Sequence, residues 1–362
     1  MFFRFIFLYT FLPILIAFIF NEYFIYYVAI FQCGWPDNNG SGEKLRALVL
    51  SDPHLLGEIE GHWFDKLRRE WQMYRSFQTS ISLLRPEVVF ILGDLTDEGK
   101  WATGKQWDQY VVNAKRLFAT PPGVRLYVVV GNHDIGFHHD VTNTKLTRFL
   151  KDFSTKNVET IELKGHTFVI VNSMGLEGDG CFMCQATERQ LQDAMDYINC
   201  ENSMKPKYCN SNKKHPDPIL LTHIPLFRTS DIECVGSDAG QDGKQRRFNY
   251  KDTLKESTSE RLLNLVNPRL ILSGHTHNTC HRSHKDGTPE VTVASYSWRN
   301  RNDPSFYLFT ITNDDITSSK CHLPTESTVF TLYGLAVIAS LFTLKMACNR
   351  NMRCTSKIWK RL

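Results

Sequence analysis

The stretch Ile91–Gly99, with the sequence ILGDLTDEG, places a carboxylate, Asp94, directly after an apolar run that begins at Val88. A short apolar run that ends in an abrupt turn is typical of a buried parallel strand that presents a functional side chain at its carboxyl end. Alone, Asp94 is explained equally well as an ordinary turn aspartate. Its importance depends on whether other strands end in the same way.

Four other stretches repeat the pattern of an apolar run followed at once by residues that bind metal ions. They read LVLSDPH at 48–54, VVVGNHD at 128–134, ILLTH at 219–223 and LILSGHTH at 270–277. The carboxyl ends of parallel strands meet at one edge of a sheet, so these stretches can place their polar side chains in one cleft. The candidate ligands are Asp52, His54, Asp94, Asn132, His223, His275 and His277.

The candidate ligands offer oxygen and nitrogen donors without a thiolate, which favours Mn, Fe or Zn over Ca and disfavours a structural zinc site built on cysteines. A set of this size exceeds the need of one ion, and a bridging carboxylate suits two ions about 3.5–4 Å apart, as in phosphoryl transfer. Singly, each residue has another explanation, as a strand-end turn, a helix cap or a buried core histidine. Their joint occurrence favours a two-metal site.

The chain resembles the calcineurin-like metallophosphoesterases in five ordered motifs, which are Asp52-x-His54, Gly93-Asp94, Gly131-Asn132-His133-Asp134, His223 and Gly274-His275-x-His277. The resemblance implies two divalent ions: one held by Asp52, His54 and His277, the other by Asn132, His223 and His275, with Asp94 bridging them. It also implies that His133 is not a ligand but faces the leaving-group oxygen, and that Asp134 orients its ring. A histidine in that place can protonate a departing alkoxide.

Strands and helices alternate through the first part of the chain. Leu45–Ser51, Glu87–Leu92 and Arg125–Val130 have the pattern of strands, and Trp63–Leu84 and Lys100–Phe118 have the pattern of helices between them. Such a series predicts a mainly parallel sheet with covering helices. Further apolar runs later in the chain predict a second sheet. We therefore expect an α/β fold, a two-sheet β-sandwich flanked by helices, as one domain over residues 44–326.

Both ends of the chain are apolar enough to span a bilayer, which takes about 20 residues. Residues 1–31 are expected to form a transmembrane signal anchor followed by a linker at 32–43, and residues 327–346 a second transmembrane helix before a basic tail at 347–362. A cleaved signal peptide is an alternative for the first segment, and a buried core helix or a GPI-attachment signal for the second. The cationic tail, which lacks Asp and Glu, predicts a cytosolic C terminus and a lumenal main domain.

Charge and cysteine usage agree with a lumenal domain that binds no nucleic acid. The formal net charge is +4, but the cations of the tail account for it and leave the middle of the chain mildly acidic. Eight of the ten cysteines precede the second predicted span, an even number that is typical of disulfides in an oxidising compartment. Cys181 and Cys184 have a zinc or redox spacing, although a local disulfide loop with Cys200 and Cys209 is the favoured interpretation.

The surroundings of two motifs, SDPHLLG at 51–57 and GDLTDEG at 93–99, together with the two spans and the basic tail, resemble the branch of this family that remodels GPI anchors. The resemblance implies a Mn-dependent phosphodiesterase that removes the ethanolamine-phosphate side branch from the second mannose of GPI-anchored proteins. It also implies cycling between endoplasmic reticulum exit sites, the intermediate compartment and the cis-Golgi, with coat or cargo-receptor contacts through the tail. The tail departs from a retrieval signal because Lys357 and Lys360 are not paired.

The sequence leaves two other functions open. The domain could act on another phosphodiester or phosphomonoester, or it could be an inactive module that binds cargo. The presence of every candidate ligand together with His133 and Asp134 favours an enzyme. Four side chains near or after the last motif could contact the substrate phosphate, but a role in packing or at the surface is the favoured interpretation, namely for His281, His284, Trp298 and Arg299.

Overall fold

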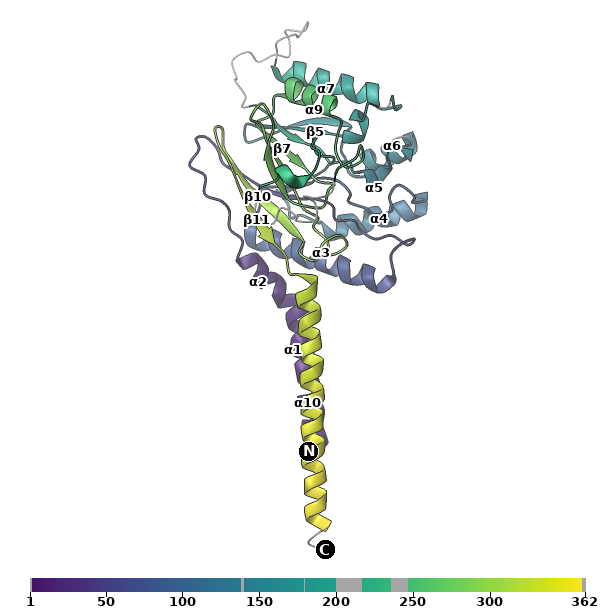
Figure 1. Cartoon of the computed structure of the whole chain (residues 1–362), viewed down its shortest axis with the longest axis vertical. Coiled ribbons are helices and arrows are strands. Elements are labelled where there is room, and N and C mark those ends of the chain that lie inside the picture. The colour runs from purple at the N-terminus through teal and green to yellow at the C-terminus, as the bar shows by residue number, and fades with distance from the viewer. Residues whose placement is uncertain (1, 138–139, 179, 200–216, 236–246, 360–362) are drawn as a thin grey trace.

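The computed structural model describes the backbone of residues 2–137, 140–178, 180–199, 217–235 and 247–359, and the side chains of the same ranges except 2–9, 199 and 347–359. Two β-sheets form the body of the domain, with helices outside them, and both ends of the chain run together in a helical stalk (Figure 1). The expected α/β fold with two sheets and flanking helices is confirmed.

The first sheet has the order β11-β10-β1-β2-β3. Strands β1, β2 and β3 run parallel, whereas β10 pairs with β1 and β11 in the antiparallel sense. The parallel strands therefore end at a common edge, and the first candidate ligands follow β1 and β2 there. The bounds of these strands are β1 (Leu45–Leu50), β2 (Val88–Ile91), β3 (Arg125–Val128), β10 (Ser305–Ile311) and β11 (Ile316–His322).

The second sheet has the order β4-β5-β6-β7-β9-β8. Its central strands β5, β6, β7 and β9 are parallel, and β4 and β8 close its edges as antiparallel partners. The loops after β6 and β7 carry the remaining histidine ligands. The bounds are β4 (Val158–Leu163), β5 (His166–Val171), β6 (Ile219–Leu221), β7 (Leu270–Ser273), β8 (Cys280–Ser283) and β9 (Pro289–Thr292).

Alternate side chains of each strand enter two different hydrophobic layers. Val49 of β1 belongs to the layer that the two sheets share, whereas Leu48 belongs to the core that includes the helices. Phe90 of β2 contacts Phe168 of β5 across the shared layer, with ring centroids 5.0 Å apart. Because a shift of one residue would exchange the two layers, burial fixes the register of β1 and the position of Asp52 after it.

Helices cover the sheets on their outer sides. α3 (Trp63–Leu84) and α4 (Gly104–Leu117) lie towards the stalk, and α7 (Cys184–Asn199) and α9 (Glu256–Val266) lie at the opposite end of the domain (Figure 1). α3 buries Met73, Phe77 and Ile81 at four-residue spacing, as an amphipathic helix does. α6 (Asn143–Asp152) packs on α4 through Phe149 and Trp107.

The two ends of the chain form adjacent helices. The first segment is divided into α1 (Phe2–Ile19), the π-helical turn η1 (Phe20–Phe24) and α2 (Ile25–Phe31), and α10 (Glu326–Trp359) runs beside α1 (Figure 1). Within the described residues, Thr10–Phe31 and Glu326–Met346 are long and apolar enough to cross a membrane. α2 is partly buried against the domain, since Ile30 joins the main core. The helix α10 continues through most of the segment that the sequence predicts as a tail.

Disulfides connect three pairs of cysteines in the described part of the chain: Cys33 with Cys321, Cys181 with Cys184, and Cys234 with Cys280. The first pair joins the end of α2 to β11. Cys200 and Cys209, which the sequence places in a loop with the second pair, lie outside the described residues.

Some elements have no clear signal in the sequence. β11, with the sequence ITSSKCH, lacks the alternation of apolar and polar residues that predicts a strand, because it lies at a sheet edge and buries few side chains. β8 and α6 are likewise not predicted. α4 begins at Gly104 instead of Lys100, because Thr103 and Gln106 form a capping box that starts the helix.

Candidate metal centre

The loops after β1, β2 and β7 hold their polar residues in an uncommon backbone conformation. Asp52, His54, Asp94, His275 and His277 all have positive φ, between 48° and 70°. Residues other than glycine rarely adopt this region, and such strain is concentrated at functional sites. The tertiary structure therefore holds these loops in place against their local preference.

Small residues allow the loops to approach one another. A side chain at Gly131 would collide with the backbone of Asp94, and one at Gly274 would collide with Ser51. The His275 backbone N–H donates to Asp52 Oδ2 at 3.0 Å, which ties the loop after β7 to the loop after β1. Glycine at these positions thus brings ligands from both sheets together.

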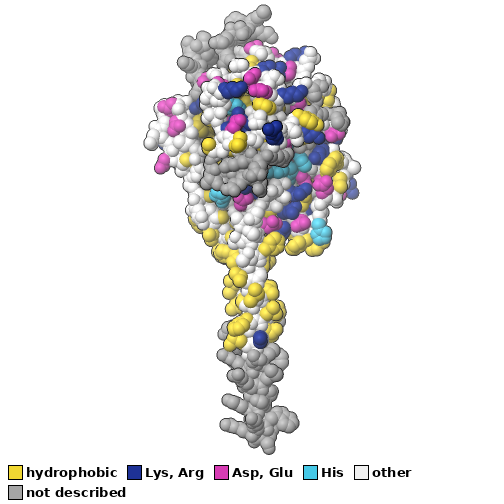
Figure 2. All heavy atoms as spheres, in the orientation of Figure 1, with side chains coloured by type: hydrophobic (Ala, Val, Ile, Leu, Met, Phe, Trp, Pro, Cys, Tyr) yellow, Lys and Arg dark blue, Asp and Glu magenta, His cyan; other side chains and the backbone are white. Residues whose placement is uncertain are grey.

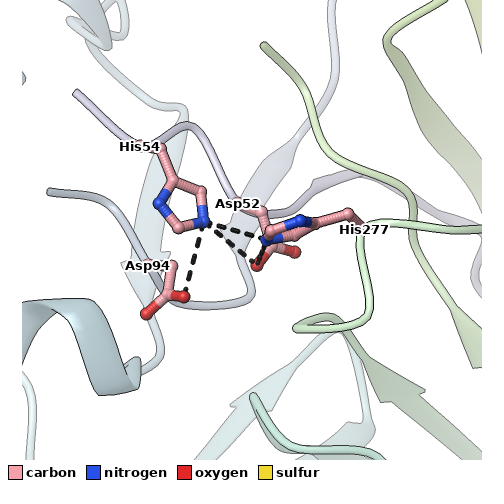
Figure 3. A group of neighbouring side chains, drawn as sticks. All are labelled: Asp52, His54, Asp94 and His277. Carbon is pink, nitrogen blue, oxygen red and sulfur yellow. Dashed lines mark hydrogen bonds and ion pairs between the residues drawn. The ribbon is translucent and has the colours of Figure 1, made fainter. Parts of the chain in front are cut away.

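The first group of donors contains Asp52, His54, Asp94 and His277 (Figure 3). The His54 Nε2 atom lies 3.1 Å from His277 Nε2, 3.5 Å from Asp94 Oδ2 and 3.8 Å from Asp52 Oδ1. The His277 Nε2 atom lies 3.7 Å from Asp52 Oδ1. Four donor atoms thus lie close together, and they belong to the residues that the resemblance implies for the first ion.

The second group contains Asp94, His223 and His275, with Asn132 beside it. The His223 Nε2 atom lies 3.3 Å from Asp94 Oδ2 and 3.0 Å from Asn132 Oδ1. The same oxygen of Asp94 therefore faces both groups. All seven residues predicted as ligands are brought together, in the two sets that the resemblance implies.

Hydrogen bonds on the far side of the histidine rings fix which nitrogen carries the hydrogen. His54 Nδ1 lies 2.7 Å from Asp97 Oδ1, His223 Nδ1 lies 2.7 Å from the Leu92 carbonyl, and His275 Nε2 lies 2.7 Å from the Lys251 carbonyl. These oxygens accept hydrogen bonds, so the nitrogens that face them donate. The lone pairs of the opposite nitrogens are consequently directed to the donor groups, as metal-binding histidines require.

The atom that most clearly fits a metal is His275 Nδ1. It is buried, and it has no hydrogen-bond partner among the described residues. A buried nitrogen with a free lone pair is unfavourable unless a donor or a cation satisfies it. Together with the oxygen and nitrogen chemistry of the two groups, this atom fits a site for two divalent cations.

The buried carboxylates create a strongly negative environment. Burial would raise the pKa of Asp52, but the hydrogen bond with His54 and the charges of the other histidines lower it to about 2. Burial would lower the pKa of His54, yet Asp52, Asp97 and Asp94 raise it to about 10. In His277 burial prevails and lowers the pKa to about 4. A field that attracts a proton to His54 when no metal is bound also favours a divalent cation.

His133 lies at the rim of the centre and is held by Asp97. Its Nδ1 is 2.9 Å from the Asp97 carbonyl and 3.2 Å from Asp97 Oδ1, and its backbone N–H donates to Asp94 Oδ1 at 2.7 Å. Its side chain is 29% exposed, so His133 lies at the solvent-facing side of the centre. The Lys100 Nζ atom lies 3.3 Å from His133 Nδ1 and 3.5 Å from Nε2. The centre thus has a histidine and a cation at its open side.

Asp134 does not contact the His133 ring, contrary to the sequence expectation. Its carboxylate is buried and accepts hydrogen bonds from the Thr96 N–H at 2.8 Å, the Thr96 hydroxyl at 2.9 Å and the Gly131 N–H at 3.0 Å. Burial and the charge of Asp94 raise the pKa of Asp134 to about 6. The residue therefore joins the loops after β2 and β3, and Asp97 orients His133 instead.

Asp97, Lys100 and Arg299 are residues of the centre that the sequence argument does not identify. Arg299 Nε lies 3.3 Å from Asp97 Oδ2, so a partly exposed side chain expected at the surface also contacts the centre. For the other three side chains after the last motif, packing is confirmed: His281 contacts Tyr307, His284 pairs with Glu290, and Trp298 is buried beside η1 and α10. The signal for Asp97 was its place three residues after Asp94, in the same polar turn.

Residues 45–279 match the family described as Calcineurin-like phosphoesterase. The chain belongs to the calcineurin-like phosphoesterase family. Three similar curated proteins are called Metallophosphoesterase 1. The protein from Gallus gallus is 48% identical over 88% of this chain and 84% of its own length. The protein from Danio rerio is 48% identical over 91% of this chain and 88% of its own length. The protein from Mus musculus is 46% identical over 88% of this chain and 83% of its own length.

As a calcineurin-like phosphoesterase, the chain is a metal-dependent phosphoric ester hydrolase. The segment that matches the calcineurin-like phosphoesterase family contains every candidate ligand, from Asp52 to His277. It ends before β10 and α10. The relatives, in contrast, are similar over most of this chain, so the likeness extends beyond the metal centre.

Proposed function

We propose that this chain is a phosphodiesterase that removes the ethanolamine-phosphate branch from the second mannose of GPI anchors and so promotes exit of GPI-anchored proteins from the endoplasmic reticulum. The observation that carries the proposal is a two-part donor centre that shares Asp94, on a domain attached to two candidate membrane helices. An enzyme held at a membrane by both ends meets a lipid-linked glycan at a high effective concentration.

The reaction follows from the residues around the centre. Two divalent ions, which we propose to be Mn, would supply charge neutralisation of the phosphate and activation of water. Asp97 holds the hydrogen on His133 Nδ1, so Nε2 is the atom that exchanges a proton with the leaving oxygen. The Lys100 ammonium, 3.5 Å from that nitrogen, stabilises negative charge that develops nearby.

The proposed compartment is the lumen of the endoplasmic reticulum, its exit sites, the intermediate compartment and the cis-Golgi. The disulfides Cys33–Cys321 and Cys234–Cys280 support an oxidising environment, because such bonds are rare in the cytosol. The basic residues after Leu344 support a cytosolic C terminus. In this topology the GPI-anchored proteins are substrates on the lumenal side, and α10 presents its end to coat or cargo-receptor proteins.

Mass spectrometry of GPI glycans tests the substrate. Cells that lack this chain should retain ethanolamine phosphate on the second mannose, and the wild-type chain should remove it whereas Asp94→Asn should not. Unchanged ethanolamine-phosphate content would refute the GPI proposal. Turnover of bis-(p-nitrophenyl) phosphate by the purified chain with added Mn separates an enzyme on another substrate from an inactive cargo-binding module.

A further inference from the structure

A cavity of about 440 Å³ lies where η1, the first turns of α3 and the start of α10 meet. It is separate from the metal centre, since none of the seven candidate ligands lines it. Most of its wall is apolar or aromatic, including Phe18, Tyr23, Phe64, Leu67, Trp71 and Phe330. A cavity of this size and character suits a small ligand with a hydrocarbon part.

The length of α1 places the cavity at a membrane boundary if α1 and α10 span a bilayer. α1 has 18 residues, which give about 27 Å of helix at about 1.5 Å per residue, close to the hydrocarbon thickness of about 30 Å. η1 follows α1 directly, and α2 then packs on the domain. The cavity beside η1 therefore lies level with the lipid headgroups.

The start of α3 exposes large apolar side chains next to the cavity. Trp63, Phe64 and Leu67 are 70%, 50% and 60% exposed. Hydrophobic side chains also lie along the described part of the stalk and continue to the adjoining edge of the domain (Figure 2). Tryptophan is enriched at membrane interfaces, and a contiguous apolar surface marks a contact with lipid or protein. The apolar surface at the start of α3 is continuous with the apolar surface of the candidate spans, which favours a contact with lipid over a contact with protein.

Polar groups inside the cavity show which lipid fits. Asn21 is 1% exposed, its Nδ2 donates to the Val329 carbonyl at 3.3 Å, and its Oδ1 has no partner in the described part of the chain. Glu22, on the same turn, accepts a hydrogen bond from the Tyr333 hydroxyl at 2.5 Å. The α3 side contributes Arg68, whose two terminal nitrogens pair with Glu326 and Asp65, while its buried Nε has no hydrogen-bond partner among the described residues. The cavity thus offers an acceptor and a carboxylate together with a cationic donor.

We propose that the cavity binds the headgroup and upper acyl chain of phosphatidylethanolamine from the adjoining leaflet. The primary ammonium donates to Asn21 and is attracted by Glu22, the phosphate accepts from Arg68, and the chain lies against the aromatic wall. Phosphatidylcholine has no hydrogen to donate, so it leaves Asn21 Oδ1 unsatisfied. This inference goes beyond the proposed reaction and rests only on the two candidate spans.

The cavity is linked to the metal centre by a short path. Trp298 lines the cavity and its indole N–H donates to the Pro324 carbonyl at 2.9 Å, while its neighbour Arg299 contacts Asp97. A lipid in the cavity therefore stabilises the segment that carries Arg299. It also holds the start of α3 on the membrane.

Lipid retention by the full-length chain tests the site without measuring turnover. The chain is reconstituted in nanodiscs with equal amounts of phosphatidylethanolamine and phosphatidylcholine, extracted gently and analysed by native mass spectrometry. We expect retention of phosphatidylethanolamine over phosphatidylcholine by about fivefold or more, the effect of one buried unsatisfied acceptor. Asn21→Leu should abolish the preference, and Asn21→Asp should keep it. Equal retention of both lipids by the wild type would overturn the proposal.

A matched pair of variants tests the location. Leu67→Trp fills the cavity and should reduce retention of phosphatidylethanolamine to background, whereas Leu335→Trp, at a position 57% exposed on α10 outside the cavity, should not. A phosphatidylethanolamine with a photoreactive acyl chain should label residues 63–71 in addition to α1 and α10. Labelling of α1 and α10 alone would overturn the site, and a lack of labelling on all three helices would overturn the spans themselves.

Discussion

Asp97 Oδ1 lies 2.7 Å from His54 Nδ1, so a residue outside the ligand set holds one of the ligands. The same carboxylate is 3.2 Å from His133 Nδ1 and is paired with Arg299 at its other oxygen. Burial would raise the pKa of Asp97, but its hydrogen bonds to His133 and His54 keep it well below the ordinary range. Asp97 is therefore charged at neutral pH and fixes both rings.

Asp97→Asn is expected to reduce metal affinity and turnover together. An amide has one acceptor oxygen and no charge, so it cannot hold both rings and Arg299 as the carboxylate does. Changes of such supporting groups cost about 10–100-fold in affinity or activity. Metal titration and turnover of bis-(p-nitrophenyl) phosphate measure the two effects. Wild-type values for both would show that Asp97 does not support the centre.

Asp94→Asn is expected to remove both ions, whereas His54→Asn or His223→Asn should weaken one. Asp94 Oδ2 faces His54 at 3.5 Å and His223 at 3.3 Å, and it belongs to both donor groups. The histidines each belong to one group. Metal content per chain after dialysis should therefore fall from about two to nearly none in the first variant and to about one in the others. Equal losses in all three would contradict the bridging position.

His133→Ala is expected to keep both ions and to lose activity in a way that depends on the leaving group. General acid catalysis contributes about 10²–10⁴-fold, and p-nitrophenolate needs little of it because it leaves without a proton. The variant should therefore be impaired far more on a phosphodiester with an alkyl leaving group than on bis-(p-nitrophenyl) phosphate. Metal analysis of the same preparation is the control. Empty metal sites, or equal losses of activity on both substrates, would show that His133 is not the general acid.

Lys100→Met is expected to lower turnover at constant metal content. The ammonium lies 3.3 Å from His133 Nδ1 at the open side of the centre, where it meets the charge of the phosphate. Loss of one such donor typically costs about 10²–10³-fold in turnover, and less for a partly exposed lysine. Lys105→Met, which replaces an exposed lysine at the second position of α4, is the matched control. Similar activities of the two variants would exclude Lys100 from the reaction.

Residues that follow strands were predictable from the sequence, whereas the contacts between distant loops were not. The apolar runs before Asp52, Asp94 and His223 fix strand ends, and parallel pairing aligns the ends of β1 and β2 in the first sheet and those of β6 and β7 in the second. Asp97 was not identified because its place in a polar turn, three residues after Asp94, does not show that His54 and His133 converge on it. Arg299 reaches the centre from a loop after β9, a contact that depends on the packing of the two sheets.

In the terminal segments, too, the sequence predicts the elements but not the contacts between them. Hydropathy predicts two spans, and the structure has two candidate helices there. It does not predict that η1 divides the first helix and places Asn21 against Val329 of the second. Such a contact joins residues from opposite ends of the chain, which no local pattern encodes.

Glu290→Gln is expected to destabilise the domain at neutral pH. Glu290 is buried and accepts from the Leu226 N–H at 3.0 Å and the Ser273 hydroxyl at 2.9 Å, and its second oxygen lies 3.0 Å from His284 Nε2. Leaving a buried donor without its acceptor costs about 1–3 kcal/mol of unfolding free energy, and more where the acceptor is charged. Glu256→Gln, which removes an exposed partner of Lys285, should change stability by less than about 0.5 kcal/mol.

The destabilisation by Glu290→Gln should become smaller as the pH falls. Burial would raise the pKa of Glu290, but the hydrogen bond with His284 and the charge of Arg228 lower it below its ordinary value. A carboxylate with a lowered folded-state pKa contributes stability above its unfolded pKa of about 4.3 and loses it as pH falls through the folded value. The difference between the wild type and Glu290→Gln in thermal unfolding of the full chain should therefore be largest near pH 7 and shrink below about pH 4. A difference that stayed constant or grew on acidification would show that packing, and not the charge of Glu290, stabilises this part of the sheet.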